Sequence, residues 1–302
     1  MSDVQLNTLI DLPDGLSTFI ARDDGTRLRC ISAGQGPALI LAHGIFNDLR
    51  SFNLVQGSLI DKGYQVIVFD QRGHGASTIG SDGLGSKQMA GDCKAVLEHF
   101  GVRDGVLVGH SMGAFLSVVL AECFPDVVRE RLRGMLFIAG HAGIVAKGSI
   151  QNRLQIPLVK AGLMPAILSS EWLGRAFTRT VFGRVADREF VEATRLILAS
   201  QKLKVMTPLV DFQVQEDHYP GLASIGVETV VLCGERDRTC PRWHSERLGA
   251  EIPSARNVWL PDIGHMVVYE APNSVENAVT QLVEGQPSGK RLVFPQRPGS
   301  LR

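Results

Sequence analysis

The clearest arrangement of residues that could do chemistry is a serine placed between two glycines. Residues 109–113 read Gly-His-Ser-Met-Gly, directly after the apolar run of residues 105–108 and directly before a helical pattern that begins at Ala114. A serine at such a strand-to-helix turn sits on a strained backbone that exposes its hydroxyl, and the flanking glycines let the helix approach the strand closely. This spacing predicts that Ser111 is a nucleophile.

A serine hydroxyl is a poor nucleophile at neutral pH, so it needs a base within hydrogen-bonding reach. Of the eight histidines, His265 follows the last apolar run of strand length and precedes the last predicted helix. A histidine base in turn needs a carboxylate that fixes its tautomer and stabilises the imidazolium. Asp237, just beyond another apolar run, is the expected carboxylate, with Glu235 and Asp262 as competitors.

Attack by a serine on a carbonyl group creates a negatively charged oxygen that must meet preorganised donors. Residues 43–46 read His-Gly-Ile-Phe and follow the apolar run of residues 38–42. The expected donors are the backbone amides of Ile45 and of Met112, the residue after the serine. His43 is interpreted as structural, holding this loop by hydrogen bonds.

These side chains need a scaffold that brings distant segments together. Apolar runs of strand length, typical of strands buried on both faces, recur at residues 38–42, 65–69, 106–108, 135–139, 229–233 and 258–260. Segments with helical period alternate with them, at residues 87–100, 114–123, 241–250 and 274–282. This alternation predicts a parallel sheet, whose carboxyl edge would collect the loops that carry Ser111, Asp237 and His265.

Three regions depart from the alternation. Residues 18–33 read as a hairpin around an Asp-Gly turn, which predicts an antiparallel edge. Residues 141–221 hold helical patterns and prolines but no buried strand, which predicts an inserted helical lid between two core segments, residues 1–140 and 222–284. Residues 285–302 are rich in Gly, Pro, Ser, Gln and Arg and predict a mobile tail, because they cannot bury enough apolar surface to offset their ordering entropy.

The overall composition predicts a globular, soluble protein in which any charge effect is local. In 302 residues, 31 basic side chains balance 31 acidic ones, so no whole-molecule field would attract nucleic acid or a membrane surface. The sequence contains no run of eighteen apolar residues, so no membrane span is predicted. The five cysteines are scattered and the N-terminus lacks the features of a secretory signal, so we expect free thiols and a cytoplasmic location.

Taken together, the motifs resemble those of the α/β-hydrolase superfamily. They comprise His-Gly at residues 43–44, Asp-Gln-Arg-Gly-His-Gly-Ala-Ser at residues 70–77, the serine turn, and the late aspartate and histidine in that order. The resemblance implies a mostly parallel eight-stranded sheet with helices on both faces and a helical lid after the sixth strand. It also implies that Asp70, Arg72 and His74 form a structural turn, and that His110 packs rather than reacts.

The resemblance also bears on the reaction. Relatives that open epoxides or displace halide are expected to carry a carboxylate nucleophile, and this chain has Ser111 in that place. We therefore expect cleavage of a small-molecule ester, thioester or lactone through an acyl-enzyme, without a metal or organic cofactor. Carbon–carbon bond hydrolases, haloperoxidases and oxygenases of the same fold, and non-enzymatic ligand-binding members, remain alternatives.

The predicted lid is basic, which bears on the substrate. Residues 141–205 hold ten Lys or Arg against four Asp or Glu. These cations either form a solvated outer face or attract an anionic substrate, such as a half-ester or an acyl group on an acidic carrier. The expected substrate contacts are Phe46, His141, Trp172 and Met266. The other apolar lid side chains could line an acyl pocket or pack the lid on the core: Leu163, Met164, Leu173, Phe177 and Phe182.

Overall fold

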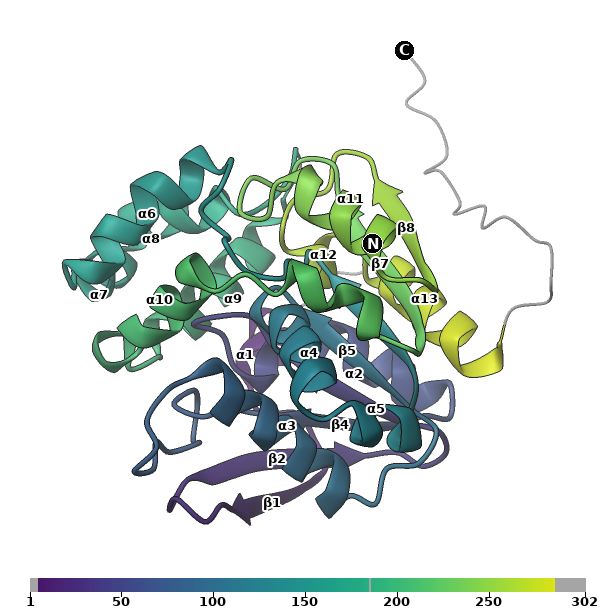
Figure 1. Ribbon diagram of the computed structural model, residues 1–302. Coiled ribbons are helices and arrows are strands. Elements are labelled where there is room, and N and C mark those ends of the chain that lie inside the picture. The colour runs from purple at the N-terminus through teal and green to yellow at the C-terminus, as the bar shows by residue number, and fades with distance from the viewer. Residues whose placement is uncertain (1–4, 185, 286–302) are drawn as a thin grey trace.

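An eight-stranded sheet forms the centre of this computed structural model, which describes residues 5–184 and 186–285. Its strand order is β1-β2-β4-β3-β5-β6-β7-β8 (Figure 1). In chain order the strands are β1 (Leu16–Ala21), β2 (Arg27–Ala33), β3 (Ala38–Ala42), β4 (Gln65–Phe69), β5 (Gly105–His110), β6 (Leu132–Ile138), β7 (Glu228–Gly234) and β8 (Ala255–Leu260). From β4 to β8 every neighbouring pair is parallel, whereas β1 and β2 add an antiparallel edge.

The strands form where the sequence offers continuous apolar runs. All five residues of β3 are buried, because Leu39 and Leu41 face one layer of the core while Ile40 and Ala42 face the other. A strand covered on both faces needs no polar side, which is why these runs do not alternate with polar residues. The predicted fold class, a mostly parallel eight-stranded sheet with helices on both faces, is confirmed.

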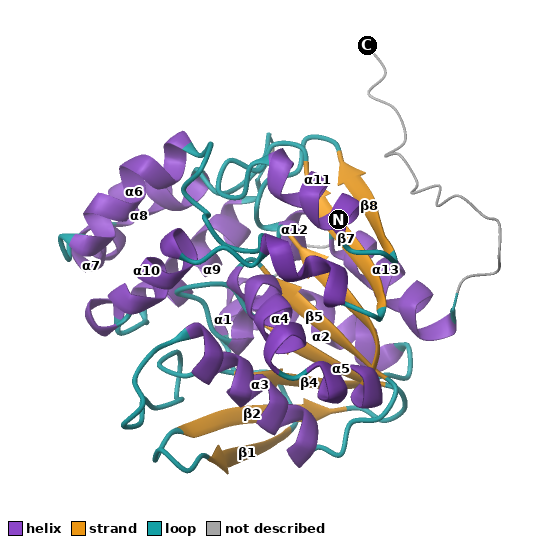
Figure 2. Ribbon diagram, in the orientation of Figure 1, coloured by secondary structure: helices purple, strands orange, loops and turns teal. Residues whose placement is uncertain are grey.

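Helices cover both faces of the sheet (Figure 2). One face packs against α3 (Ser86–His99), α4 (Met112–Cys123), α5 (Pro125–Arg131), the short helix η3 (Tyr219–Ser224) and α11 (Arg242–Glu251). The other face packs against α1 (Leu6–Ile10), the short helix η1 (Leu49–Phe52), α2 (Asn53–Asp61), α12 (Val267–Glu270) and α13 (Pro272–Glu284). Within the described residues no helix has the length and apolar character needed to cross a bilayer.

The chain between β6 and β7 forms a helical insert. It comprises α6 (Ile150–Lys160), α7 (Met164–Ser169), α8 (Glu171–Arg179), α9 (Arg188–Ala199), η2 (Leu203–Val205) and α10 (Thr207–Gln215). These helices gather on one side of the molecule, away from β1 (Figure 1). Where the chain leaves and re-enters the core, Gly143 and Asp217 form an isolated antiparallel bridge. The predicted tail, apart from residue 285, lies outside the described residues.

Candidate active site

Ser111 occupies the sharp turn between β5 and α4. Its backbone angles are φ 53° and ψ −112°, a strained conformation for a residue with a side chain. A β-carbon at Gly109 would lie 2.5 Å from the amide nitrogen of Ala114, and one at Gly113 would lie 2.1 Å from the carbonyl oxygen of Ala42. The two flanking glycines are therefore required for the close approach of α4 to the strands that holds Ser111 in this turn.

His265 and Asp237 come from the loops that follow β8 and β7. The Nδ1 atom of His265 lies 2.8 Å from Oδ2 of Asp237, and both side chains are buried. The other carboxylate oxygen, Oδ1, accepts hydrogen bonds from the backbone amides of Thr239 at 2.8 Å and Cys240 at 2.9 Å. Because Asp237 can only accept, it fixes the proton of His265 on Nδ1 and leaves Nε2 free to act as a base.

The two competing carboxylates lie elsewhere. Asp262 faces the guanidinium groups of Arg236 at 3.6 Å and Arg184 at 3.9 Å, and Glu235 faces Arg242 at 3.7 Å. Both carboxylates are exposed and neither is hydrogen-bonded to His265. Among the described residues, Asp237 alone supplies a carboxylate to this histidine.

The loop after β3 and the start of α4 each present one free backbone donor near Ser111. Within the described part of the chain, neither the amide of Ile45 nor that of Met112 donates to a protein acceptor. The next amide along, that of Phe46, is already used, because it donates to Nε2 of His74 at 3.2 Å. Phe46 also has a positive φ of 59°, and it lines the same cavity as Ser111. The amides of Ile45 and Met112 could therefore receive a developing oxyanion.

Two neutral histidines hold this loop. The backbone amide of Gln71 donates to Nε2 of His43 at 3.0 Å, and Nδ1 of His43 donates to the carbonyl oxygen of Gly44 at 2.8 Å. Burial lowers the pKa of His43, and burial together with the neighbouring His43 lowers the pKa of His74 to about 3. Both rings thus keep one bare nitrogen that accepts a backbone hydrogen bond, a supporting role for the loop.

The Asp70–Arg72 turn also packs the core. Asp70 accepts hydrogen bonds from the backbone amides of Leu49 at 3.1 Å and Ala76 at 2.8 Å. Arg72 forms a buried ion pair with Asp92, with Nε and Oδ2 2.7 Å apart. Neither side chain lines the cavity that holds Ser111.

Ser111 and His265 share the wall of one apolar cavity. Its empty space, counting the opening to solvent, is about 980 Å³, and it extends under the helical insert. The apolar lining side chains come mostly from the insert: Ile45, Phe46, Val145, Ile156, Val159, Met164, Leu168, Phe177, Val181, Leu198, Leu203, Val210 and Met266. The described lining contains no Lys, Arg, Asp or Glu.

Two expected substrate contacts do not reach this cavity. Trp172 is 76% exposed on the outer side of α8, because the opposite side of that helix, with Gly174 and Thr178, is the side that packs inward. His141 is fully buried under the cavity floor, where its Nε2 lies 3.2 Å from Oε1 of Gln213 and burial lowers its pKa to about 3. Neither residue lines the cavity, whereas Phe46 and Met266 do, and a role for any of the four as a substrate contact stays a prediction.

The basic residues of the insert mostly face other partners. Arg195 and Arg175 both form ion pairs with Glu192, at 2.6 and 2.7 Å. Lys160 forms an ion pair with Asp211 at 2.6 Å. The described cavity lining therefore offers no cation to an anionic substrate.

A buried thiol beside the serine escaped the sequence reasoning. Donor atoms of Cys240, Asp237 and His265 all lie within 4.8 Å of one another, a grouping that could hold a metal ion. However, both oxygens of Asp237 and Nδ1 of His265 are already committed to hydrogen bonds. Burial, followed by the charge of Asp237, also raises the pKa of the Cys240 thiol well above its ordinary value. The group is therefore better suited to moving a proton than to binding a cation.

The loop that carries His265 is fastened to the insert, a contact with no sequence signal. The backbone amide of His265 donates to the carbonyl oxygen of Val181 at 2.8 Å. The Glu270 carboxylate accepts from the amides of Gly183 at 2.7 Å and Gly264 at 3.0 Å, and thereby bridges the two segments. Burial raises the pKa of Glu270 to about 7 against these two hydrogen bonds. The position of the histidine thus depends on the insert.

Sequence comparisons place the chain among hydrolases. It is 28% identical over 259 residues to the sn-1-specific diacylglycerol lipase ABHD11 of Mus musculus, covering 82% of this chain and 81% of the relative. It is 25% identical over 271 residues to protein ABHD8 of Bos taurus, covering 88% of this chain but only 61% of that longer protein.

Solved structures share the fold at low sequence identity. An esterase from Exiguobacterium antarcticum superposes with a TM-score of 0.76 at 19% identity, covering 89% of this chain and 100% of that one. A bromoperoxidase from Bacillus anthracis gives a TM-score of 0.77 at 19% identity with the same coverage. The model of the alpha/beta hydrolase family matches residues 39–278, which is most of the chain and includes Ser111, Asp237 and His265. The chain belongs to the alpha/beta hydrolase family.

Proposed function

We propose that this protein is a serine hydrolase that cleaves a carboxylic ester, thioester or lactone of a small, neutral and largely apolar molecule. The observation that carries the proposal is the hydrogen bond between Asp237 and His265 at the wall of the cavity that also holds Ser111. Nucleophile, base and orienting acid would then form a catalytic triad. Bromoperoxidases share the fold, but no residue described here favours their reaction over hydrolysis.

In the proposed reaction, Ser111 attacks the substrate carbonyl carbon while Nε2 of His265 takes the hydroxyl proton. Asp237 stabilises the imidazolium that results, and the amides of Ile45 and Met112 donate to the oxyanion. His265 then gives the proton to the leaving alcohol or thiol, and the carbonyl carbon remains bonded to Ser111 as an acyl-enzyme. In the second half, His265 removes a proton from water, which attacks the acyl carbon. The bond to Ser111 then breaks as His265 returns this proton to the serine oxygen, which releases the acid and restores the free enzyme.

The cavity supports a neutral substrate. A charged acyl group would lose its hydration in this cavity, and the described lining offers no opposite charge in place of the lost water. Burying such a group without a partner costs at least about 2 kcal/mol. The related lipase of Mus musculus, named for an action on diacylglycerol, is consistent with a hydrophobic ester. We also propose that the helical insert, within the predicted residues 141–221, acts as a lid, because helices α6 to α10 supply most of the apolar lining.

A panel of p-nitrophenyl esters tests the proposal. Neutral esters of varied acyl length are compared with half-esters that carry a free carboxylate, and we expect kcat/KM to favour the neutral esters. The Ser111→Ala variant should lose at least about 10³-fold in kcat. The control variant Ser81→Ala changes an exposed serine that does not line the cavity, and it should match the wild type. Substantial ester turnover by Ser111→Ala would contradict the proposal, and no ester turnover by the wild type would favour a carbon–carbon hydrolase or an oxygenase, whose own substrate Ser111→Ala should still convert.

A further inference from the structure

Large apolar side chains are exposed on the outer face of the helical insert. Ten such side chains are exposed among the described residues, and five of them fall within residues 150–173. We call these five the outer insert face: Ile150, Leu154, Leu163, Trp172 and Leu173. Single exposed apolar residues are ordinary on a protein surface, but such a concentration in one segment marks an interaction surface.

Four of the five residues belong to α6 and α8, and Leu163 directly precedes α7. Gln151 and Gln155 of α6 both donate hydrogen bonds to the hydroxyl of Thr180 at the end of α8, so these two helices lie side by side. Figure 1 shows α6, α7 and α8 together at the outer edge of the insert. Ile150 and Leu154, 75% and 68% exposed, are one turn apart on α6.

The same helices are apolar on their inner side. Ile156 and Val159 of α6, and Phe177 of α8, line the cavity that holds Ser111. In α6 these inward side chains lie opposite the exposed Ile150 and Leu154, and a helix that is apolar on both sides is unusual at a surface in contact with water alone. Only this layer of helices therefore separates the exposed apolar face from the proposed acyl site.

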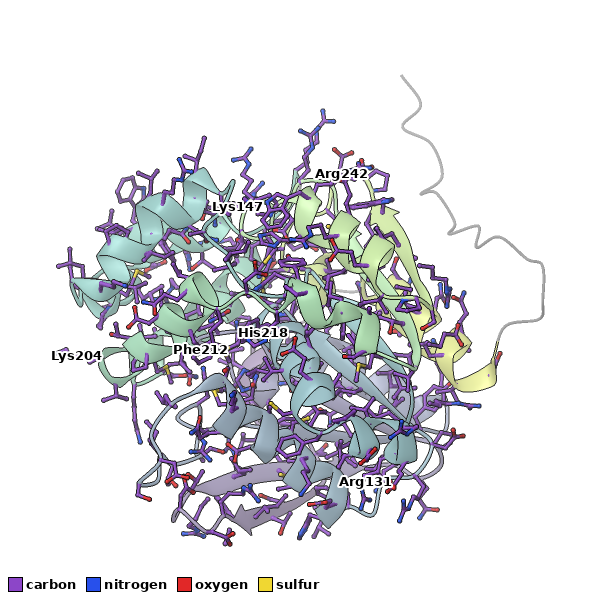
Figure 3. The ribbon with its side chains drawn as sticks, in the orientation of Figure 1. Arg131, Lys147, Lys204, Phe212, His218 and Arg242 are labelled. Carbon is purple, nitrogen blue, oxygen red and sulfur yellow. The ribbon has the colours of Figure 1, made fainter. Side chains whose placement is uncertain are left out.

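The charge of the insert selects one kind of partner. Arg153, next to Leu154 on α6, is exposed and has no ion pair among the described residues. Elsewhere on the insert, beside η2, Lys202 and Lys204 are also exposed and form no ion pair with a described residue. Figure 3 shows Lys204 at the outer edge of the molecule, on the side of the insert. A second copy of this chain would bring like charges together, which is unfavourable, whereas an anionic surface would neutralise them. An exposed Leu next to an Arg, on an insert that also exposes Trp172 and two lysines, suits the boundary between lipid headgroups and acyl chains.

We propose that the outer insert face docks on an anionic lipid surface, with its apolar side chains entering the headgroup boundary and its cations facing the lipid phosphates. Docking would place the cavity next to the phase in which an apolar ester accumulates. The binding itself does not depend on the hydrolase activity, so it holds or fails separately from the function proposed for Ser111.

Vesicle flotation with the full chain tests this proposal. The wild type and the Ser111→Ala variant should both float with vesicles of phosphatidylcholine and phosphatidylglycerol, and less with phosphatidylcholine alone or at high salt. A triple variant, Ile150→Ser, Leu154→Ser and Trp172→Ser, should partition about tenfold more weakly. The matched control is Leu16→Ser with Phe19→Ser, which removes exposed apolar side chains from β1, at the opposite side of the molecule.

Several outcomes would overturn the proposal. These are no flotation of the wild type, equal flotation of the triple variant, or equal loss in the β1 control. Sedimentation equilibrium tests whether a second copy of the chain binds this face instead. A wild-type protein that is dimeric and does not bind vesicles, together with a triple variant that is monomeric, would assign the face to a second copy. Thermal unfolding of each variant shows whether it remains folded. Quenching of Trp172 by brominated acyl chains, absent in Trp172→Phe, would place this side chain in the lipid.

Discussion

Three carboxylates lie in the loops that follow β7 and β8, at the same edge of the sheet, and their partners distinguish them. Asp237 bonds His265 and two backbone amides, whereas Glu235 and Asp262 face arginines in solvent. Asp237→Asn keeps the size of the side chain but can place its amide group against Nδ1 and favour the wrong tautomer. We expect kcat to fall about 10⁴-fold at neutral pH with little change in melting temperature. Glu235→Gln and Asp262→Asn are the controls, and equal losses in all three variants would refute the assignment.

Cys240 lies beside the proposed nucleophile without sharing its role. Its thiol is buried and its pKa is raised well above the ordinary value, so the reactive thiolate is scarce. We expect iodoacetamide at pH 8 to alkylate the exposed Cys123 and to leave esterase activity intact. Peptide mass spectrometry locates the adduct, and inactivation that follows alkylation of Cys240 would show that the thiol takes part in the reaction.

At the scale of elements, the contact between the insert and the His265 loop holds the histidine that we propose as the base. A β-carbon at Gly183 would lie 2.1 Å from the carbonyl oxygen of Asp262 and 2.6 Å from the amide nitrogen of Gly264, so the two segments would have to separate. Gly183→Ala should therefore cost about 1–3 kcal/mol of unfolding free energy and also lower kcat. Gly226→Ala is the matched control, because a β-carbon there meets no atom within 4 Å. Equal behaviour of the two variants in urea unfolding and ester hydrolysis would contradict this role.

The elements themselves were largely predictable from the sequence. The runs of residues 38–42 and 65–69 coincide with β3 and β4, because an apolar run buried on both faces leaves a local signal. The serine turn is equally local, since its glycines are required by close contacts within a few residues and with β3. By contrast, the bridge from Glu270 to Gly183 and Gly264 joins segments far apart in the chain, so no spacing reveals it.

The insert shows why the rest could not be predicted. Its helical character followed from the sequence pattern, but the direction in which each side chain points depends on how the helices pack. Trp172, an expected substrate contact, points outward, while Phe177 on the same helix lines the cavity. His141 follows a predicted strand and is therefore expected at the active-site edge of the sheet, yet it is buried against Gln213 of α10.

At the scale of the whole molecule, His218 ties the insert to the core. Its Nδ1 lies 2.6 Å from Glu122 at the end of α4, and its Nε2 lies 2.8 Å from Glu216 just after α10, near the centre of the molecule in Figure 3. Burial lowers the pKa of His218, but the hydrogen bonds with the two glutamates outweigh burial and raise it above 6.5. Because the folded state holds this proton more tightly than the unfolded chain, the stabilisation is complete below pH 6.5. It is lost as the pH rises through the raised pKa.

The corresponding variant is His218→Gln, which cannot carry the charge. We expect its unfolding free energy to be lower than that of the wild type by about 1 kcal/mol at pH 6, and the difference to shrink toward pH 9. Urea unfolding at both pH values measures this difference. A difference that stays constant with pH would mean that the imidazolium does not stabilise the junction.

The most direct test of the account is whether Ser111 is the nucleophile. The folded wild-type protein is treated with a fluorophosphonate probe, which bonds covalently to an activated serine, and the labelled peptide is identified by mass spectrometry. We predict one adduct on Ser111, formed in step with the loss of esterase activity and greatly slowed in His265→Gln. Loss of activity without an adduct on Ser111, or full activity with Ser111 labelled, would contradict the central claim.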